Sequence, residues 1–191
     1  MKPSRLAYAL ALLVPFAANA GSWHADAKAS TLAFSGTQQG EAFDGHFKAF
    51  DATIVFDPAQ LATSRFDVKI TLASADTANS ERDDSLHGAD FFDAAHTPVA
   101  TYTATKFRSL GGNRYAADGT LNLHGVSKPI TLTFAWAAGA TPALVGDALV
   151  NRLDFKVGGG QWADTSQIAN AVKVHTSLKL VATAPAASAK K

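Results

Sequence analysis

The sequence has 191 residues, with 17 lysines and arginines against 16 aspartates and glutamates, so its formal net charge is +1 and no basic stripe indicates a nucleic-acid partner. It contains no cysteine, which excludes disulfides, thiol catalysis, cysteine-ligated zinc and iron–sulfur clusters. Stability therefore has to come from a buried core.

Residues 1–20 have the pattern of a cleaved secretory signal. Lys2 and Arg5 precede an apolar run over residues 6–18, which is too short to span a membrane, and Ala-Asn-Ala over 18–20 is a typical cleavage site. No cysteine follows that could carry a lipid. We therefore expect cleavage at this site, export and no stable membrane anchor.

The chain after the signal is long enough for one domain with a sizeable core, which we expect over residues 21–182. The last residues, 183–191, are mostly small and lack apolar periodicity, so we expect a flexible C-terminal tail. The sequence does not indicate an oligomeric state.

Apolar and polar residues alternate with a period of two through most of this domain, which predicts β-strands. The alternation is strictest over 65–72, 129–136 and 171–180. Between Phe47 and Phe50 its parity switches, which predicts a bulge or a tight bend. In chain order, the predicted strands cover residues 31–37, 45–56, 65–72, 99–107, 114–123, 129–136, 144–157 and 171–180.

Two segments, 74–95 and 158–170, do not alternate. In the first, Ser80-x-x-Asp83 is a helix-start signal ahead of the apolar Leu86, so we expect one or two short helices there. The strands lie mostly one turn apart, which favours antiparallel neighbours. About eight such strands with one apolar face need either a second layer or closure, and a closed barrel has no free edges and encloses a narrow interior.

Acidic and histidine side chains are dense between Ser80 and His96, and such side chains serve metal binding and proton transfer. An EF-hand loop that started at Asp83 would place Ala94 where a glutamate is needed. The chain has no nucleophile elbow, phosphate loop or His-Glu-x-x-His motif. We expect no catalytic residue and no metal ligand, and a hydrolase or metal-dependent enzyme that uses these carboxylates is the alternative. The side chains concerned are Glu81, Asp83, Asp84, His87, Asp90, Asp93 and His96.

The apolar residues between these charges are Leu86, Phe91 and Phe92. They are not expected to face water together, because burying each side chain contributes about 1.5–3 kcal/mol. We expect them to form the inner face of a lid over the mouth of the barrel.

Five polar residues are candidates for the lid or the mouth. Arg82 and Asp83 are neighbours in the chain, and we expect them to pair with Asp154 and Arg152, because two charge pairs beside an apolar lid would fix its orientation. His124 lies in the turn sequence Leu-His-Gly, where it is either an exposed turn residue or a ligand contact.

Four motifs carry a resemblance to a known family. They are GHFKAFDATIVFDP, SERDDSLHGADFFD, AADGTLNLHGVSKPITL and NRLDFKVG. In this order and spacing they resemble the YceI-like, lipocalin-like family of exported bacterial proteins, over nearly the whole mature chain from Trp23 to Val181. The residues that match the family's motifs are Arg82, Asp83, Phe91, Phe92, Asp93, Gly119, Leu121, Gly125, Lys128, Pro129, Arg152, Asp154 and Phe155.

This resemblance implies an all-β fold, an extended eight-stranded antiparallel lipocalin-like barrel with a short helical lid segment over one opening. It also implies an apolar tunnel that binds a long isoprenoid or a similar lipid-like molecule, with no catalysis. For an exported chain, the resemblance implies a location in the periplasm. Relatives often have His-Ser where this chain has Ala29-Ser30, which implies a different head-group preference if that histidine contacts the head group.

The predicted function is to bind and sequester or carry a long-chain amphiphilic lipid, such as a polyisoprenoid or a quinone, with no other cofactor. Alanines at many inward positions leave room for a ligand. They also fit a filled barrel that protects against stress or binds a partner through its outer face, which is the second alternative. The residues predicted to line the tunnel and the lid are Phe34, Phe50, Phe66, Val68, Ile70, Leu86, Phe91, Phe92, Leu132, Phe134, Trp136, Phe155, Val174 and Leu178.

Overall fold

Strands account for more than half of the described chain, which covers residues 21–183 in the computed structural model. Residues 1–20, the predicted signal, and 184–191, most of the predicted tail, lie outside the described residues. The strands are β1 (Gly21–Ala25), β2 (Thr31–Gln38), β3 (Glu41–Phe47), β4 (Phe50–Phe56), β5 (Arg65–Thr71), β6 (Ala75–Asp76), β7 (Val99–Gly111), β8 (Arg114–Leu123), β9 (Val126–Ala137), β10 (Ala143–Asn151) and β11 (Ala171–Ala182). The helical elements are α1 (Ser80–His87) and the 3-10 turns η1 (Leu61–Thr63), η2 (Leu72–Ser74), η3 (Arg152–Phe155) and η4 (Gly160–Trp162).

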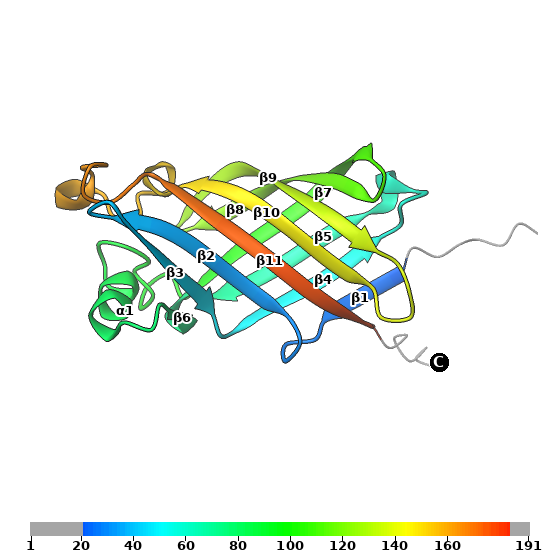
Figure 1. The fold of residues 1–191 in the computed structure, drawn as a ribbon, viewed down its shortest axis with the longest axis horizontal. Helices are drawn as coiled ribbons and strands as arrows, with labels where there is room; N and C mark the ends of the chain where they lie inside the picture. The colour runs from blue at the N-terminus through cyan, green and yellow to red at the C-terminus, as the bar shows by residue number, and fades with distance from the viewer. Residues whose placement is uncertain (1–20, 184–191) are drawn as a thin grey trace, which may run out of the picture.

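The strands form one antiparallel sheet that closes on itself (Figure 1). β11 makes the closure, because its second edge pairs with β2 over residues 173–177 and with β1 over residues 180–182. β1 and β2 therefore share one position in the barrel, and β3 and β4 share the next, since β3 pairs with β2 and β4 pairs with β1. With β5, β7, β8, β9, β10 and β11, this makes a closed eight-stranded antiparallel barrel, so the predicted fold class is confirmed.

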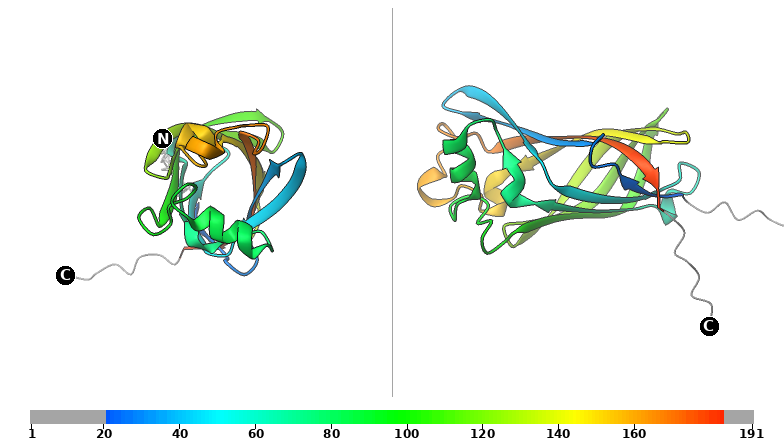
Figure 2. Two further views of the ribbon diagram at one scale, coloured as in Figure 1. Left: turned by 90° about the vertical axis from the view of Figure 1, so that its left-hand side faces the viewer. Right: turned by 90° about the horizontal axis from the view of Figure 1, so that it is seen from below.

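The bend between β3 and β4 lies where the apolar parity switches in the sequence, so the predicted break is confirmed. Ser74 supports the bend, because its carbonyl and hydroxyl oxygens accept the N–H groups of Lys48 and Ala49 at 3.0 Å. Beyond the bend the β2–β3 hairpin leans away from the barrel wall (Figure 2). Over residues 41–45, the outer edge of β3 pairs with no other strand of the described chain.

β10 is shorter than the alternation predicts, which corrects the predicted strand over 144–157. The strand ends at Asn151, and the chain then turns through η3 with Lys156 at a φ of +60°. Phe155 and Val157 are both buried, which explains why the apolar alternation continues past the strand, but they lie in η3 and the turn after it.

α1 lies across one end of the barrel (Figure 2, left). Its N-cap is Asn79, whose side chain accepts the N–H of Arg82 at 3.0 Å, one residue earlier than the predicted start signal at Ser80. Asp83 instead accepts the N–H and the hydroxyl of Thr77 at 2.8 and 2.7 Å. Over residues 21–183, no helix has the length and the apolar character that a membrane crossing requires.

An aromatic cluster, the aromatic plug, fills the end of the barrel away from α1. Phe56 lies at its centre, with ring centroids 4.9 Å from Trp136, 5.0 Å from Tyr115 and 5.3 Å from Phe134. The ring pairs are T-shaped or tilted, which are arrangements that aromatic rings favour. The members of the plug are Phe56, Phe66, Phe107, Tyr115, Phe134 and Trp136.

Replacing Phe56 by alanine is expected to lower the free energy of unfolding by about 3–5 kcal/mol, because the loss of its ring leaves a cavity inside the plug. Urea unfolding followed by tryptophan fluorescence measures the change. The control is Leu149→Ala on β10, where the side chain is 63% exposed and the expected change is below about 0.5 kcal/mol. Equally small losses in both variants would show that the plug does not hold this end of the barrel.

Candidate functional site: an apolar cavity and its polar mouth

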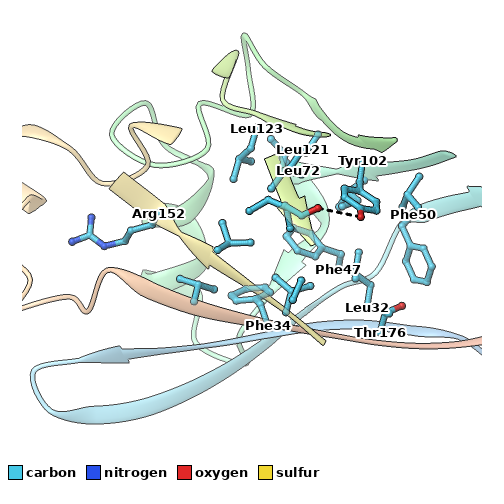
Figure 3. Close-up of a pocket in the computed structure, with 18 of the residues that line it drawn as sticks. Leu32, Phe34, Phe47, Phe50, Leu72, Tyr102, Leu121, Leu123, Arg152 and Thr176 are labelled. Atoms are coloured by element: carbon cyan, nitrogen blue, oxygen red, sulfur yellow. Dashed lines mark hydrogen bonds between the residues drawn. The ribbon is translucent and has the colours of Figure 1, made fainter. Parts of the chain in front are cut away.

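An apolar cavity occupies the barrel between the aromatic plug and α1. Figure 3 shows part of its lining. The volume of the cavity is about 200 Å³. Within the described chain, the polar side chains on its wall are those of Thr37, Tyr102, Arg152 and Thr176. Arg152 lies at one end of the cavity, and Tyr102 and Thr176 lie towards the other (Figure 3). Such a wall favours an apolar ligand, which gains by leaving water.

Strand alternation produces this wall. Val68 on β5 pairs with Ala52 on β4 and with Tyr102 on β7, and all three side chains face the interior. Ala52 and Ala100 are 1% and 2% exposed, so they are fully enclosed and yet small. Because these central positions carry methyl groups and not larger side chains, the middle of the barrel stays open.

Most of the residues predicted to line the tunnel and the lid do lie on the cavity wall. The lid residues come from α1 and the turn that follows it, and the others come from five different strands. Phe66 also belongs to the aromatic plug, so it forms part of the cavity floor. The predicted residues on the wall are Phe34, Phe50, Phe66, Val68, Ile70, Leu86, Phe91, Phe92, Leu132, Val174 and Leu178.

Three predicted tunnel residues lie elsewhere. Phe134 and Trp136 face inward as their alternation predicts, but they pack around Phe56 in the plug and do not reach the cavity. Phe155 is buried in η3, outside the barrel strands. The alternation identifies the inward face of a strand correctly, but it does not show how far along the barrel a residue lies.

Other wall residues were not singled out in the sequence. Leu32 and Val172 share the strand parity of Phe34 and Val174, so the alternation alone could have found them. Phe43 lies near the tip of the β2–β3 hairpin, where no alternation was recognised.

Tyr102 is a polar side chain on the inner wall of the barrel, and its hydroxyl is not available to a ligand. Its hydroxyl donates to the carbonyl of Ala117 at 2.8 Å and lies 3.3 Å from that of Ile130. Burial raises the pKa of Tyr102, so the phenol stays neutral. Its hydroxyl proton is already used in the hydrogen bond to Ala117.

Arg152 is a buried cation that holds a loop together. Its side chain is 4% exposed, and burial lowers its pKa. All five N–H groups of the guanidinium donate to backbone carbonyls, at 3.1, 3.0, 2.5, 2.7 and 2.8 Å. Gly158 is needed here, because a Cβ at this residue would lie 2.6 Å from Nη1. The carbonyls belong to Ala169, Val157, Gly158, Trp162 and Ile168.

The predicted pairing of Arg82 and Asp83 with Asp154 and Arg152 is wrong. Asp83 accepts hydrogen bonds from Thr77 within its own turn, and Arg152 donates hydrogen bonds to the carbonyls of its own loop. Asp154 is exposed and forms no ion pair with the described residues. Asp83 and Arg152 are thus satisfied within their own turn and loop, so the predicted charge pairs do not orient the lid.

His124 is a turn residue beside the cavity. It has a φ of +51° in the hairpin turn between β8 and β9, and its Nδ1 lies 3.3 Å from the carbonyl of Phe155. Its neighbour Leu123 lines the cavity. The histidine therefore ties this turn to η3, near the same end of the barrel as α1.

The acidic residues between Ser80 and His96 are used separately. Asp90 accepts from the indole N–H of Trp162 at 3.2 Å, and Asp93 contacts the ring of His96 at 2.8 Å. This contact raises the pKa of His96. Among residues 21–183, no three histidine or acidic side chains come together in a group that could hold a metal ion.

A second hollow, the vestibule, lies between α1, the β2–β3 hairpin and η4. Four of its residues, Phe43, Leu86, Phe91 and Ile168, also line the cavity, so the two spaces adjoin. Unlike the cavity, the vestibule has a mixed lining. Its other residues are Gln38, Asn79, Glu81, Arg82, Ser85 and Trp162.

Comparison with known proteins agrees with the barrel and its motifs. Residues 23–180 match the family model of the YceI-like domain. The chain belongs to the YceI-like family. This YceI-like protein is 33% identical over 169 residues to a UPF0312 protein of Vibrio vulnificus (strain YJ016), a match that covers 82% of this chain and 89% of the relative.

Two solved structures share the fold of this YceI-like protein. BcnA of Burkholderia cenocepacia is 34% identical with a TM-score of 0.78, over 83% of this chain and 99% of BcnA. A polyisoprenoid binding domain from Saccharophagus degradans is 20% identical with a TM-score of 0.66, over 84% of this chain and 98% of that domain.

Replacing Arg152 by methionine is expected to lower the free energy of unfolding by about 3 kcal/mol or more, because the buried carbonyls lose their donors. Arg152→Lys keeps the charge but supplies fewer N–H groups, so it should recover only part of the loss. Urea unfolding measures both, with Arg114→Met, an exposed arginine at the β7–β8 hairpin, as the control. If Arg152→Lys were as stable as the natural protein, the carbonyl contacts would not carry the role assigned to them.

Proposed function

We propose that this YceI-like protein binds a long-chain amphiphilic lipid, such as a polyisoprenoid or a quinone, and sequesters or carries it without chemical change. One observation carries the proposal: a long apolar cavity adjoins a vestibule with polar side chains. An apolar cavity next to a vestibule with polar side chains matches a molecule with an apolar tail and a polar head.

The energetics favour a long tail. Each buried CH₂ group contributes about 0.8 kcal/mol. A tail of about ten carbons therefore contributes about 8 kcal/mol, which lies within the cost of association of about 4–15 kcal/mol, and a tail of about twenty carbons offsets the whole of this range. Because this gain needs no directional contact, tight binding requires few polar groups on the wall, in keeping with the apolar lining of the cavity.

Two further points support binding without catalysis. Three carboxylates of the 80–96 segment, those of Asp83, Asp90 and Asp93, are engaged separately by Thr77, Trp162 and His96. The barrel is also shared with a domain described as polyisoprenoid binding, which supports the proposal at the level of the fold. The cavity itself disfavours the filled-barrel alternative.

We also propose that the protein acts in the periplasm after export. The support is the sequence pattern of residues 1–20, in which two basic residues precede an apolar run and a small-residue cleavage site. An exported carrier without a membrane anchor would keep the tail of its lipid out of water between membranes.

Organic extraction of the purified protein followed by mass spectrometry is expected to yield a long-chain lipid at close to one molecule per protein. Ala148→Phe should reduce this lipid content strongly, because Ala148 lines the cavity and a ring there fills the space. The matched control is Leu149→Phe, the next residue on β10, which is exposed and should keep the lipid.

Two results would contradict the proposed function. One is a protein that contains no lipid and takes none up from vesicles containing polyprenols or quinones. The other is equal lipid content in the two variants, which would show that the bound molecule does not occupy the cavity.

A further inference from the structure

The side chain of Arg82 is an unused cationic group on the wall of the vestibule. Its Nε is buried and has no hydrogen-bond partner among the described residues. No carboxylate of the described chain forms an ion pair with this guanidinium. The group lies over the ring of Phe43, 4.5 Å from the centroid, which positions it but satisfies none of its N–H groups. A buried donor without an acceptor is unfavourable, so a bound acceptor here would be stabilising.

The other arginine on the walls of these two spaces is not available to a ligand. Arg152 lines the cavity, but its five N–H groups already donate to backbone carbonyls. Arg82 has the opposite situation, since its backbone N–H is bound by Asn79 while its guanidinium has no acceptor within residues 21–183. The two arginines are therefore distinguishable by their contacts: one holds the loop, and the other faces the vestibule.

The helix connects Arg82 to the cavity. Arg82 and Leu86 are four residues apart in α1, so they lie on the same face of the helix, one turn from each other. Leu86 lines both the cavity and the vestibule. A ligand whose tail contacts Leu86 in the cavity would therefore bring its head group close to Arg82.

The free donors of the vestibule define the head group that it fits. Arg82 has five N–H donors, and Asn79 keeps its side-chain NH₂ because only its oxygen is used by the helix cap. Two lining side chains offer less: Trp162 already donates to Asp90, and the hydroxyl of Ser85 donates to the carbonyl of Glu81. Glu81 is the carboxylate that faces the same hollow.

We propose that the vestibule binds the head group of the lipid and that Arg82 recognises acceptor oxygens there, with an anionic phosphate or carboxylate bound more tightly than an alcohol. A guanidinium suits such groups because its N–H donors match two oxygens at once. This inference rests on the proposed function, since it assigns the polar end of the same bound molecule.

The test measures the binding of farnesol, farnesyl monophosphate and farnesoic acid to the delipidated protein by isothermal titration calorimetry. The three ligands share one tail, so their differences report the head group. We expect the two anions to bind about tenfold more tightly than the alcohol, because one charge-assisted hydrogen bond to the guanidinium contributes a gain of about this size. A preference for the phosphate alone would identify a phosphate head group, and an equal gain for the acid would identify a general anion site.

Variants assign this preference to Arg82. In Arg82→Gln the ratio of anion to alcohol affinity should fall to about one. In Arg82→Lys the ratio should be intermediate, because the positive charge stays but the paired N–H donors of the guanidinium are lost. Arg114→Gln removes a positive charge far from the vestibule and should keep the ratio of the natural protein. Should Arg82→Gln fail to fold, Glu81→Gln replaces it. Loss of this carboxylate should raise the affinity of the protein for the two anions about twofold and leave its affinity for the alcohol unchanged.

The outcomes separate the two proposals. If all three ligands bind equally, or if the anion preference survives in Arg82→Gln, the head-group assignment is overturned while the lipid-binding function stands. If none of the ligands binds, the proposed function itself fails. An anion preference that is lost in Arg82→Gln and kept in Arg114→Gln supports the assignment.

Discussion

The closure of the sheet at β11 is the constraint on which the rest of the structure depends. β11 pairs with β10 on one edge and with β2 and then β1 on the other, so the apolar faces of all the wall strands turn towards one axis. Without this closure the same strands would expose a broad apolar face to water, which costs far more than single side chains do. Closure also satisfies the backbone groups at what would otherwise be free edges.

The enclosed interior changes character along the barrel. Aromatic rings fill one end, alanine and branched aliphatic side chains leave the middle open, and the vestibule at the other end mixes apolar and polar groups. The two ends also differ in how they are built. Ring packing closes the first, whereas α1 and the loop around Arg152 form the second, through caps and carbonyl contacts and not through strand pairing. The molecule thus presents a gradient of polarity that suits an amphiphile.

Much of the barrel could be predicted from alternation, and the reason is physical. Phe66, Val68 and Ile70 repeat every second residue, and a strand with this period can bury only one face. The short β1 escaped prediction because its five residues do not alternate clearly, and it is held by pairing to both β4 and β11. Phe134 and Trp136 were predicted to face inward, but their depth in the barrel depends on strand tilt and register, which local pattern does not encode.

By itself, the sequence determined most of the strands and their inward faces, the helical segment that contains α1 and the family, because these follow from residue spacing and from motifs in order. Only the tertiary structure decided which charges meet. Asp83 and Arg152 have equally suitable partners in the sequence, yet each is satisfied by groups within its own turn or loop, since nearby backbone atoms are reached before distant side chains. The guanidinium of Arg82, in contrast, has no acceptor among residues 21–183, and it lines the vestibule because α1 lies across the open end of the barrel.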